Sequence, residues 1–274
     1  MKFFESLTAD GKKVRGLLSD ADKKEIIVIH FHGFGGDCFA NPFLKIMHEK
    51  YPQNGISFLS VNTRYSGYLV ENYSESSVSY SGASIDDYKN VVNDVDAVLQ
   101  CFEQEYKICI LQGHSFGTNL IKLYLRTTQK NNYAIFLSPS DSISLYQAWK
   151  NGKNIKNIAP INDSYLIRLD NFGMKSDYGE YQIPITDTSL FCLLSSEIFN
   201  EWSVPIKPLT NKSLVIKGSK DKISNLGTTE TSVLQLLPTC SDFSIMGAKH
   251  IFNGYEEELF KIILNWFYEN KIKA

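Results

Sequence analysis

The sequence lacks long apolar runs and long runs of charge of one sign. Its 274 residues include 28 basic and 30 acidic side chains, for a formal net charge of -2. Nucleic-acid binders usually carry a basic stripe, so nucleic acid is not an expected partner. No stretch reaches the length of a membrane span, and Met1 to Asp10 contain no apolar segment typical of a secretory signal. We therefore expect a cytoplasmic protein with no membrane span.

Paired cysteines and the common cofactor motifs are also missing. The five cysteines form no C-x-x-C pair and leave an odd count, which argues against a disulfide framework and a zinc cage. The glycine-rich segment His32 to Gly36 (H-G-F-G-G) has neither the G-K-[ST] of a phosphate loop nor the G-x-G-x-x-G spacing of a dinucleotide site. No cofactor and no metal site are predicted.

What is present is the composition of a globular protein, with 43% hydrophobic and 21% charged residues. The β-branched run Glu25 to Phe31 shows no polar alternation, which is typical of a strand covered on both faces of a parallel sheet. Strands alternate with helices along the chain, so we expect an α/β fold with a mostly parallel central sheet flanked by helices. Beyond the run at 25–31, we expect a hairpin over 3–18, strands over 56–61, 107–112, 133–137, 213–217 and 242–246, and helices over 41–50, 88–102, 118–129, 228–237 and 255–270.

The alternation is interrupted after Ser138 and Pro139 and resumes near residue 212. We assign residues 1–138 and 212–274 to the core and residues 139–211 to an inserted cap, with helical fragments over 143–150 and 188–200. The polar, glycine-containing stretch 66–84 is predicted as a loop. Two interpretations of the aromatic side chains in the cap stay open, because they either line an acyl pocket or pack the cap against the core.

Gly113 to Gly117 (G-H-S-F-G) matches the nucleophile-elbow pattern G-x-S-x-G. The motif follows a buried strand and opens a helix, as the tight turn of an elbow requires. The two glycines leave room for strand and helix backbones to approach, and Ser115 is presented at a helix N-terminus, where the dipole favours an anion. We predict that Ser115 is a nucleophile.

A serine hydroxyl needs a base and a group that orients the base. In proteins with a nucleophile elbow, the acid follows a late strand and the histidine follows the last strand. Asp221 and His250 occur in this order. The other histidines suit the role of base less well, since two end an early strand, one lies on a helix and one is the variable residue of the elbow: His30, His32, His48 and His114. Asp141 remains an alternative to Asp221 as the acid.

The segment His32 to Gly36 follows the first core strand. In proteins with a nucleophile elbow, the loop at this position donates one amide of the oxyanion hole. We assign that donor to the backbone N–H of Phe34. The N–H of Phe116, directly after the nucleophile, is the predicted second donor.

Together H-G-F-G-G, G-H-S-F-G, G-S-K-D and A-K-H resemble the α/β-hydrolase superfamily over essentially the whole chain. H-G-F combined with G-H-S resembles the small carboxylesterases that include feruloyl and cinnamoyl esterases. Residues 82–98 are similar to the corresponding helix of siderophore-esterase-like hydrolases. The cap departs from the feruloyl-type enzymes, because it is long and shares no motif with them. The resemblance implies the α/β-hydrolase fold and acyl transfer to water through an acyl-enzyme.

These observations predict a serine esterase that cleaves a carboxylic ester of a small molecule through an acyl-enzyme on Ser115. Two alternatives stay open. One is a thioesterase or acyltransferase that acts on an acyl chain in a biosynthetic pathway, since the same three side chains serve both chemistries. The other is a catalytically silent binding protein on the same fold, since fold does not determine function. The expected partner is a small-molecule ester or thioester, and the oligomeric state is not predicted.

Overall fold

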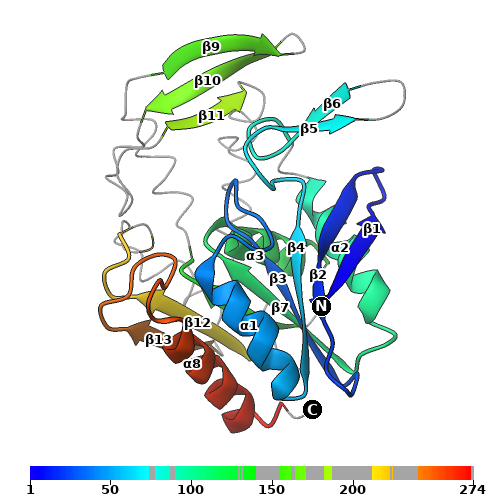
Figure 1. Ribbon diagram of the computed structural model, residues 1–274, viewed down its shortest axis with the longest axis vertical. Coiled ribbons are helices and arrows are strands. Elements are labelled where there is room, and N and C mark those ends of the chain that lie inside the picture. The colour runs from blue at the N-terminus through cyan, green and yellow to red at the C-terminus, as the bar shows by residue number, and fades with distance from the viewer. Residues whose placement is uncertain are drawn as a thin grey trace.

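The computed structural model describes residues 1–73, 78–86, 90–128, 130, 132–139, 155–161, 164–170, 182–186, 212–222, 224 and 240–272. Its central sheet consists of β1 (Lys2–Leu7), β2 (Lys13–Ser19), β3 (Ile26–Phe31), β4 (Ile56–Asn62), β7 (Ile108–His114), β8 (Tyr133–Leu137), β12 (Ser213–Gly218) and β13 (Cys240–Ile245). The eight strands lie in the order β1-β2-β4-β3-β7-β8-β12-β13 (Figure 1). Strand β2 runs antiparallel to β1 and β4, and the other neighbouring strands are parallel.

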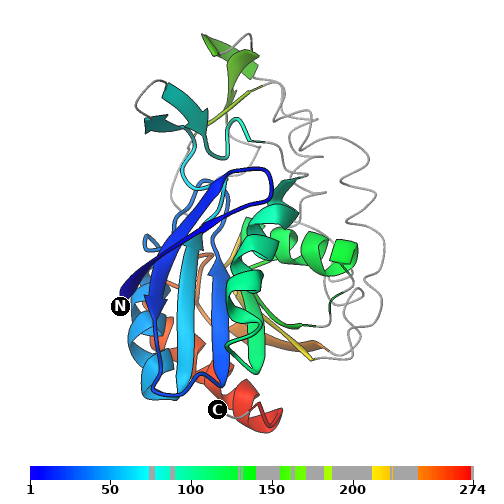
Figure 2. The same cartoon turned by 90° about the vertical axis from the view of Figure 1, so that its right-hand side faces the viewer.

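Two pairs of helices cover the two faces of this sheet (Figure 2). Helices α1 (Pro42–Gln53) and α8 (Glu256–Glu269) pack on one face, and α2 (Val91–Phe102) and α3 (Phe116–Thr128) pack on the other. The predicted α/β architecture, with a mostly parallel sheet flanked by helices, is confirmed. None of the helices in the described ranges is both long and apolar enough to cross a membrane.

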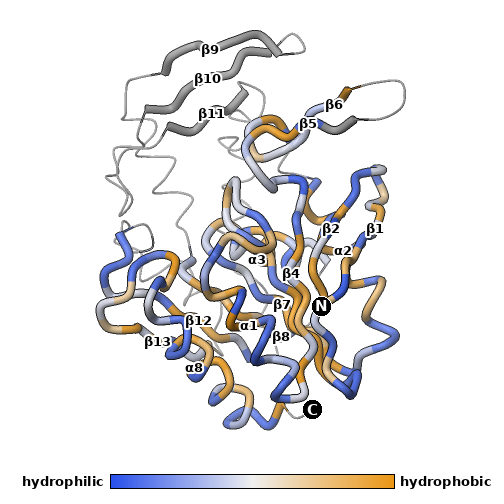
Figure 3. The backbone as a smooth tube through the Cα atoms, viewed as in Figure 1, coloured by the Kyte–Doolittle hydropathy of each residue, from blue (hydrophilic) through white to orange (hydrophobic). Residues whose placement is uncertain are grey.

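Strand β3 shows why the predicted strands are apolar without alternation. Its side chains point alternately into the two cores, with Ile27 and Ile29 among the residues beneath α2 and α3, and Ile26 and Val28 among those beneath α1 and α8. All four side chains are fully buried. Figure 3 shows the same hydrophobic colour along the neighbouring central strands. A strand enclosed on both faces has no position for a solvated side chain.

The stretch 66–84 is not the loop that the sequence predicts. It contains the antiparallel strands β5 (Val70–Tyr73) and β6 (Val78–Ser81). The base of this hairpin is closed by backbone hydrogen bonds from Ala83 N to Gly67 O and from Ser84 N to Tyr68 O, both 2.9 Å long. The paired residues are close in the sequence, from Tyr73 with Val78 to Val70 with Ser81, but most of them are polar, so the composition did not reveal two strands.

A second small sheet lies inside the range assigned to the cap. Strands β9 (Ile155–Ile161), β10 (Ser164–Asp170) and β11 (Gln182–Thr186) form it in the order β11-β10-β9. Both views place this sheet and the β5–β6 hairpin beyond the same end of the central sheet (Figures 1 and 2). No strand was predicted in this range. The cap boundaries stay a prediction, and the expected helices over 143–150, 188–200 and 228–237 lie outside the described residues.

Two glycines bring three backbones together where β7 passes into α3. A Cβ atom at Gly113 would lie 2.5 Å from the carbonyl oxygen of Gly117. A Cβ atom at Gly117 would lie 2.2 Å from the carbonyl oxygen of Phe31 and 2.7 Å from that of His32. Both contacts are with backbone atoms, which cannot move aside as the end of a side chain can. The turn therefore requires glycine at both positions.

Replacing Gly117 by Ala should strongly destabilise the fold, because the added methyl group would have to push β3 away from α3. We expect the free energy of unfolding to fall by about 3 kcal/mol or more. Urea unfolding followed by circular dichroism measures it. Gly11→Ala is the control, because Gly11 has φ of 79° but nothing within 4 Å of an added Cβ, so it tests backbone strain alone. A smaller loss for Gly117→Ala than for the control would contradict the steric explanation.

Candidate active site

Ser115 lies in the turn between β7 and α3, at the carboxyl end of the central strand. Its φ of 53° is in the left-handed region, which side chains other than glycine rarely adopt. A hydrogen bond of 2.9 Å from Ser115 N to the carbonyl oxygen of Leu137 anchors the turn to β8. Ser115 is half-buried, whereas the strand residues before it are buried. The turn thus presents one hydroxyl at the edge of the sheet.

The structure brings Ser115, His250 and Asp221 together. The Oγ atom of Ser115 lies 2.8 Å from Nε2 of His250. On the other side of the ring, Nδ1 of His250 lies 3.1 Å from Oδ1 and 3.0 Å from Oδ2 of Asp221. The rival acid of the sequence analysis, Asp141, lies outside the described residues. This arrangement can pass a proton from the serine hydroxyl to the imidazole while the carboxylate holds the ring.

Asp221 is fully buried and has specific partners for its charge. Burial opposes ionisation, but the hydrogen bond and charge of His250 and the hydrogen bonds of Ser224 outweigh it and lower the pKa of Asp221 well below its usual range. One of these bonds, from Ser224 N to Oδ1, is 3.1 Å long. The carboxylate is therefore ionised at neutral pH and accepts the Nδ1–H of His250, which leaves Nε2 available to Ser115.

The loops that carry Asp221 and His250 are joined to each other. Lys220 N donates a hydrogen bond of 2.9 Å to the carbonyl oxygen of Ala248. This approach requires Gly218 at the end of β12, because an added Cβ atom there would lie 2.3 Å from the same oxygen. The positions of the acid and the base are thus coupled by a direct backbone contact between their two loops.

The loop after β3 passes next to the nucleophile. A Cβ atom at Gly33 would lie 3.1 Å from the Cβ atom of Ser115. The rings of Phe34 and Phe116 meet edge to face, with centroids 5.6 Å apart. The two residues predicted to donate the oxyanion-hole amides therefore flank Ser115 on neighbouring segments. Their role as donors stays a prediction.

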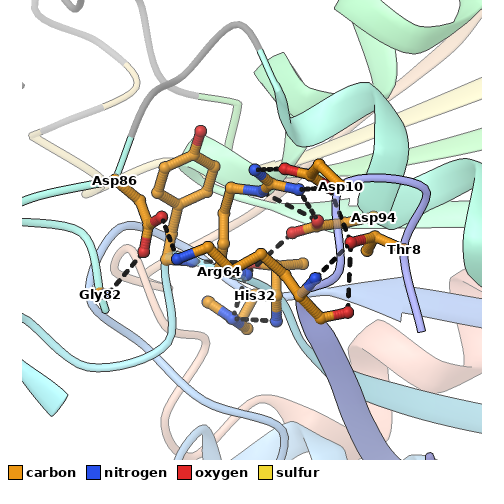
Figure 4. Close-up of polar contacts among 10 residues, drawn as sticks. Thr8, Asp10, His32, Arg64, Gly82, Asp86 and Asp94 are labelled. Carbon is orange, nitrogen blue, oxygen red and sulfur yellow. Dashed lines mark hydrogen bonds and ion pairs between the residues drawn. The ribbon is translucent and has the colours of Figure 1, made fainter. Parts of the chain in front are cut away.

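His32 ties this loop to the end of β4 (Figure 4). The carbonyl oxygen of Gly33, 2.7 Å away, can only accept, so Nδ1 of His32 donates to it. Its Nε2 then accepts from the backbone N–H of Thr63 at 3.2 Å. Burial lowers the pKa of His32, in agreement with this neutral form. The sequence indicated only that His32 is a poor candidate for the base, because no local pattern reveals these two hydrogen-bond partners.

Arg64, the residue after Thr63, lies in a buried ionic network (Figure 4). Its backbone N–H donates to Oδ2 of Asp94 at 2.8 Å, and its Nε donates to Oδ1 of the same carboxylate at 2.9 Å. Nη1 of Arg64 also lies 2.8 Å from Oδ2 of Asp10, in the turn between β1 and β2. The end of β4 is therefore fixed to α2 and to the hairpin, and it gives His32 a rigid partner.

Within the described ranges, no group of three or more His, Cys, Asp or Glu side chains is placed to hold a metal ion. The arrangement suits nucleophilic attack by a serine oxygen on an electrophilic carbon, with a proton relay through one imidazole.

Comparisons with known proteins agree on the fold. No family model matches the chain, and no curated protein matches it. Among solved structures, Est1E from Butyrivibrio proteoclasticus with ferulic acid bound has a TM-score of 0.69 and 16% identity, over 98% of this chain and 99% of that chain. The α/β hydrolase GrgF from Penicillium sp. sh18 has a TM-score of 0.67 and 15% identity, over 98% of both chains. The esterase Pf2001 from Pyrococcus furiosus has a TM-score of 0.62 and 15% identity, over 98% of this chain and 89% of that chain. These likenesses show the α/β-hydrolase fold.

A further histidine, His48 on α1, is held neutral inside the protein. Its Nε2 lies 2.8 Å from Oγ of Ser60, which itself donates to the carbonyl oxygen of Cys38 at 2.6 Å. The imidazole must therefore donate at Nε2 and accept at Nδ1, where Ser19 Oγ lies at 2.9 Å. Burial lowers the pKa of His48 to about 4. Protonation would remove the acceptor that Ser19 uses.

Stability should fall as the pH decreases from 6.5 to 4. A histidine with a lowered pKa in the folded state binds fewer protons there than in the unfolded chain, where its pKa is about 6.5. Burial also lowers the pKa of His114 to about 3. Each of these two histidines should remove on the order of 2 kcal/mol from the free energy of unfolding at pH 5. Because the pKa of Asp221 is lowered, the loss of stability that protonation of Asp221 causes occurs at a lower pH than the range from 6.5 to 4.

Urea unfolding at pH 7.5, 6.5, 5.5 and 5.0 measures this dependence. His48→Gln cannot take up a proton, so its stability should fall less steeply than that of the wild type over the same range. A wild-type stability that stays constant from pH 7.5 to 5.0 would contradict the prediction.

Proposed function

We propose that this chain, which has the α/β-hydrolase fold, is a cytoplasmic serine hydrolase that cleaves a carboxylic ester of a small molecule. The observation that carries the proposal is the separation of 2.8 Å between Ser115 Oγ and His250 Nε2, with Asp221 bound to the opposite nitrogen of the ring. Three side chains distant in the sequence meet in the order and geometry that acyl transfer by serine requires.

In the proposed mechanism, His250 removes the proton of Ser115 as the oxygen attacks the ester carbonyl carbon. The resulting imidazolium is stabilised by the Asp221 carboxylate, which stays ionised. His250 then gives the proton to the leaving alcohol, and the acyl group remains on Ser115. A water molecule, deprotonated by His250, attacks the acyl-enzyme, and the acid leaves as Ser115 regains its proton.

The amides of Phe34 and Phe116 are the proposed donors to the oxyanion that forms in each step. Phe116 begins α3, so its N–H belongs to the helix end at which the dipole favours negative charge. Phe34 lies on the loop that passes against Ser115. Removing one such donor typically costs on the order of 3 kcal/mol of transition-state stabilisation. The bond from His32 to Gly33 O supports this loop.

The esterases among the structural neighbours support an ester as the substrate, and the inserted range 139–211 is the proposed cap over the site. Est1E has been solved with ferulic acid bound, and Pf2001 is an esterase.

Ser115→Ala should lower turnover of p-nitrophenyl esters by at least about four orders of magnitude and leave the fold intact, because only the nucleophilic oxygen is lost. Turnover of short-chain and aroyl p-nitrophenyl esters measures the effect. Ser213→Ala is the matched control, because Ser213 is a buried serine at the opposite end of a strand in the same sheet. Wild-type turnover in Ser115→Ala would refute the nucleophile. A folded wild type that neither hydrolyses these esters nor reacts with a fluorophosphonate would favour a binding protein.

The site should accelerate hydrolysis of an oxygen ester more than hydrolysis of the corresponding thioester. His250 can protonate a departing alkoxide, whereas a thiolate leaves readily without a proton, so the general acid matters most for the oxygen ester. We expect a larger acceleration over the uncatalysed rate for the ethyl ester than for the S-ethyl thioester of the same acid. A larger acceleration for the thioester would favour a thioesterase, and acyl transfer to an added alcohol or amine would favour an acyltransferase.

A further inference from the structure

His114 connects the nucleophile turn to the loop that carries the base. It is the last residue of β7, directly before Ser115, and is buried. Its Nε2 lies 2.9 Å from the backbone carbonyl oxygen of His250. Its Nδ1 lies 3.5 Å from the amide nitrogen of Asn41. Since the carbonyl can only accept and the Asn41 amide nitrogen can only donate, Nε2 of His114 carries the proton and Nδ1 is the acceptor.

The surroundings of His114 keep it in this neutral form. Its ring packs against Phe43, with centroids 5.3 Å apart, and against Phe252, with centroids 6.5 Å apart. The ring of His250 lies 5.0 Å away. Burial lowers the pKa of His114 to about 3, and the nearby His250 acts in the same direction. His114 is therefore a donor that stays uncharged when a proton moves onto His250.

The loop of His250 needs such support. Phe252, two residues further on, is fully buried and has φ of 54°, in the left-handed region. This conformation costs a residue with a side chain about 1–2 kcal/mol, so contacts from elsewhere in the fold must hold it. Phe252 N bonds to the carbonyl oxygen of Lys249 within the loop. The bond to His250 O from β7 connects the same loop to the strand that ends at the nucleophile.

We propose that His114 is a positioning residue for acyl transfer, which fixes the main chain of His250 at a constant distance from Ser115. The inference rests on the proposed function. His114 and Ser115 are consecutive, so the segment that presents the nucleophile also binds the backbone of the residue that supplies the base. Asp221 determines how the imidazole ring of His250 is oriented, through its hydrogen bond to Nδ1. His114 determines where the backbone of His250 lies, through its bond to the carbonyl oxygen. A misplacement of about 1 Å between reacting groups can reduce the rate by on the order of a hundredfold.

The test compares kcat and KM on a p-nitrophenyl ester for His114→Leu and His114→Gln. Leu fills the site but has no donor, whereas Gln has an amide N–H at about the reach of Nε2. We expect His114→Leu to lower kcat by roughly 10- to 100-fold with KM within about threefold, because positioning acts on the reaction step and not on substrate binding. His114→Gln should recover most of kcat.

His48→Leu is the matched control, because His48 is also a buried, neutral histidine with both nitrogens bonded, but it touches neither Ser115 nor His250. It should keep kcat within about twofold of the wild type at a similar loss of thermal stability. Wild-type kcat in a folded His114→Leu, or equal losses of kcat in His114→Leu and His48→Leu, would overturn the positioning role. An inactive wild type would instead refute the proposed function.

A measurement on the unmodified protein covers the case in which the His114 variants do not fold. Nitrogen-15 NMR of the imidazoles identifies which ring nitrogen carries the proton. A neutral His114 with a proton on Nε2 that exchanges slowly between pH 5.5 and 8 supports the bond to His250 O. A proton on Nδ1 alone, or an imidazolium in this range, overturns it.

Discussion

The close approach of three backbones at the end of β7 is the constraint on which the site depends. Gly113 and Gly117 allow α3 to begin directly against β7 and β3. A Cβ atom at Gly117 would collide with the carbonyl oxygen of Phe31 at the end of β3. Because the chain must turn in so little space, Ser115 takes a left-handed backbone conformation and its hydroxyl is displaced toward the sheet edge. The loop at Gly33 then has to pass within van der Waals distance of the same residue.

The charged group that contacts His250 is a buried carboxylate. Asp221 is ionised because His250 and Ser224 more than compensate for its burial. His32 and His114 are kept neutral by burial, so neither adds a positive charge that would oppose protonation of His250. In a low-dielectric interior each further charge would be costly, and the arrangement favours the movement of a single proton between Ser115 and the imidazole.

Two neutral imidazoles support the site in the same way. His32 donates to the carbonyl oxygen of Gly33, next to the proposed oxyanion donor, and His114 donates to the carbonyl oxygen of His250. Each uses its second nitrogen as an acceptor, toward Thr63 or Asn41. Both residues bind main-chain atoms, so in each case a rigid ring holds the backbone of a loop in place.

By itself the sequence determined the α/β class, most elements of the central sheet, and the order of Ser115, Asp221 and His250. These follow from local periodicity and from turns that need glycine, and both are encoded in neighbouring residues. Tertiary structure alone decided the β5–β6 hairpin, the strands β9 to β11 and the partners of His32 and His114. Strand pairing depends on cross-strand contacts that local propensity does not specify. The tautomer of a histidine depends on which atoms surround its ring, which no local pattern specifies.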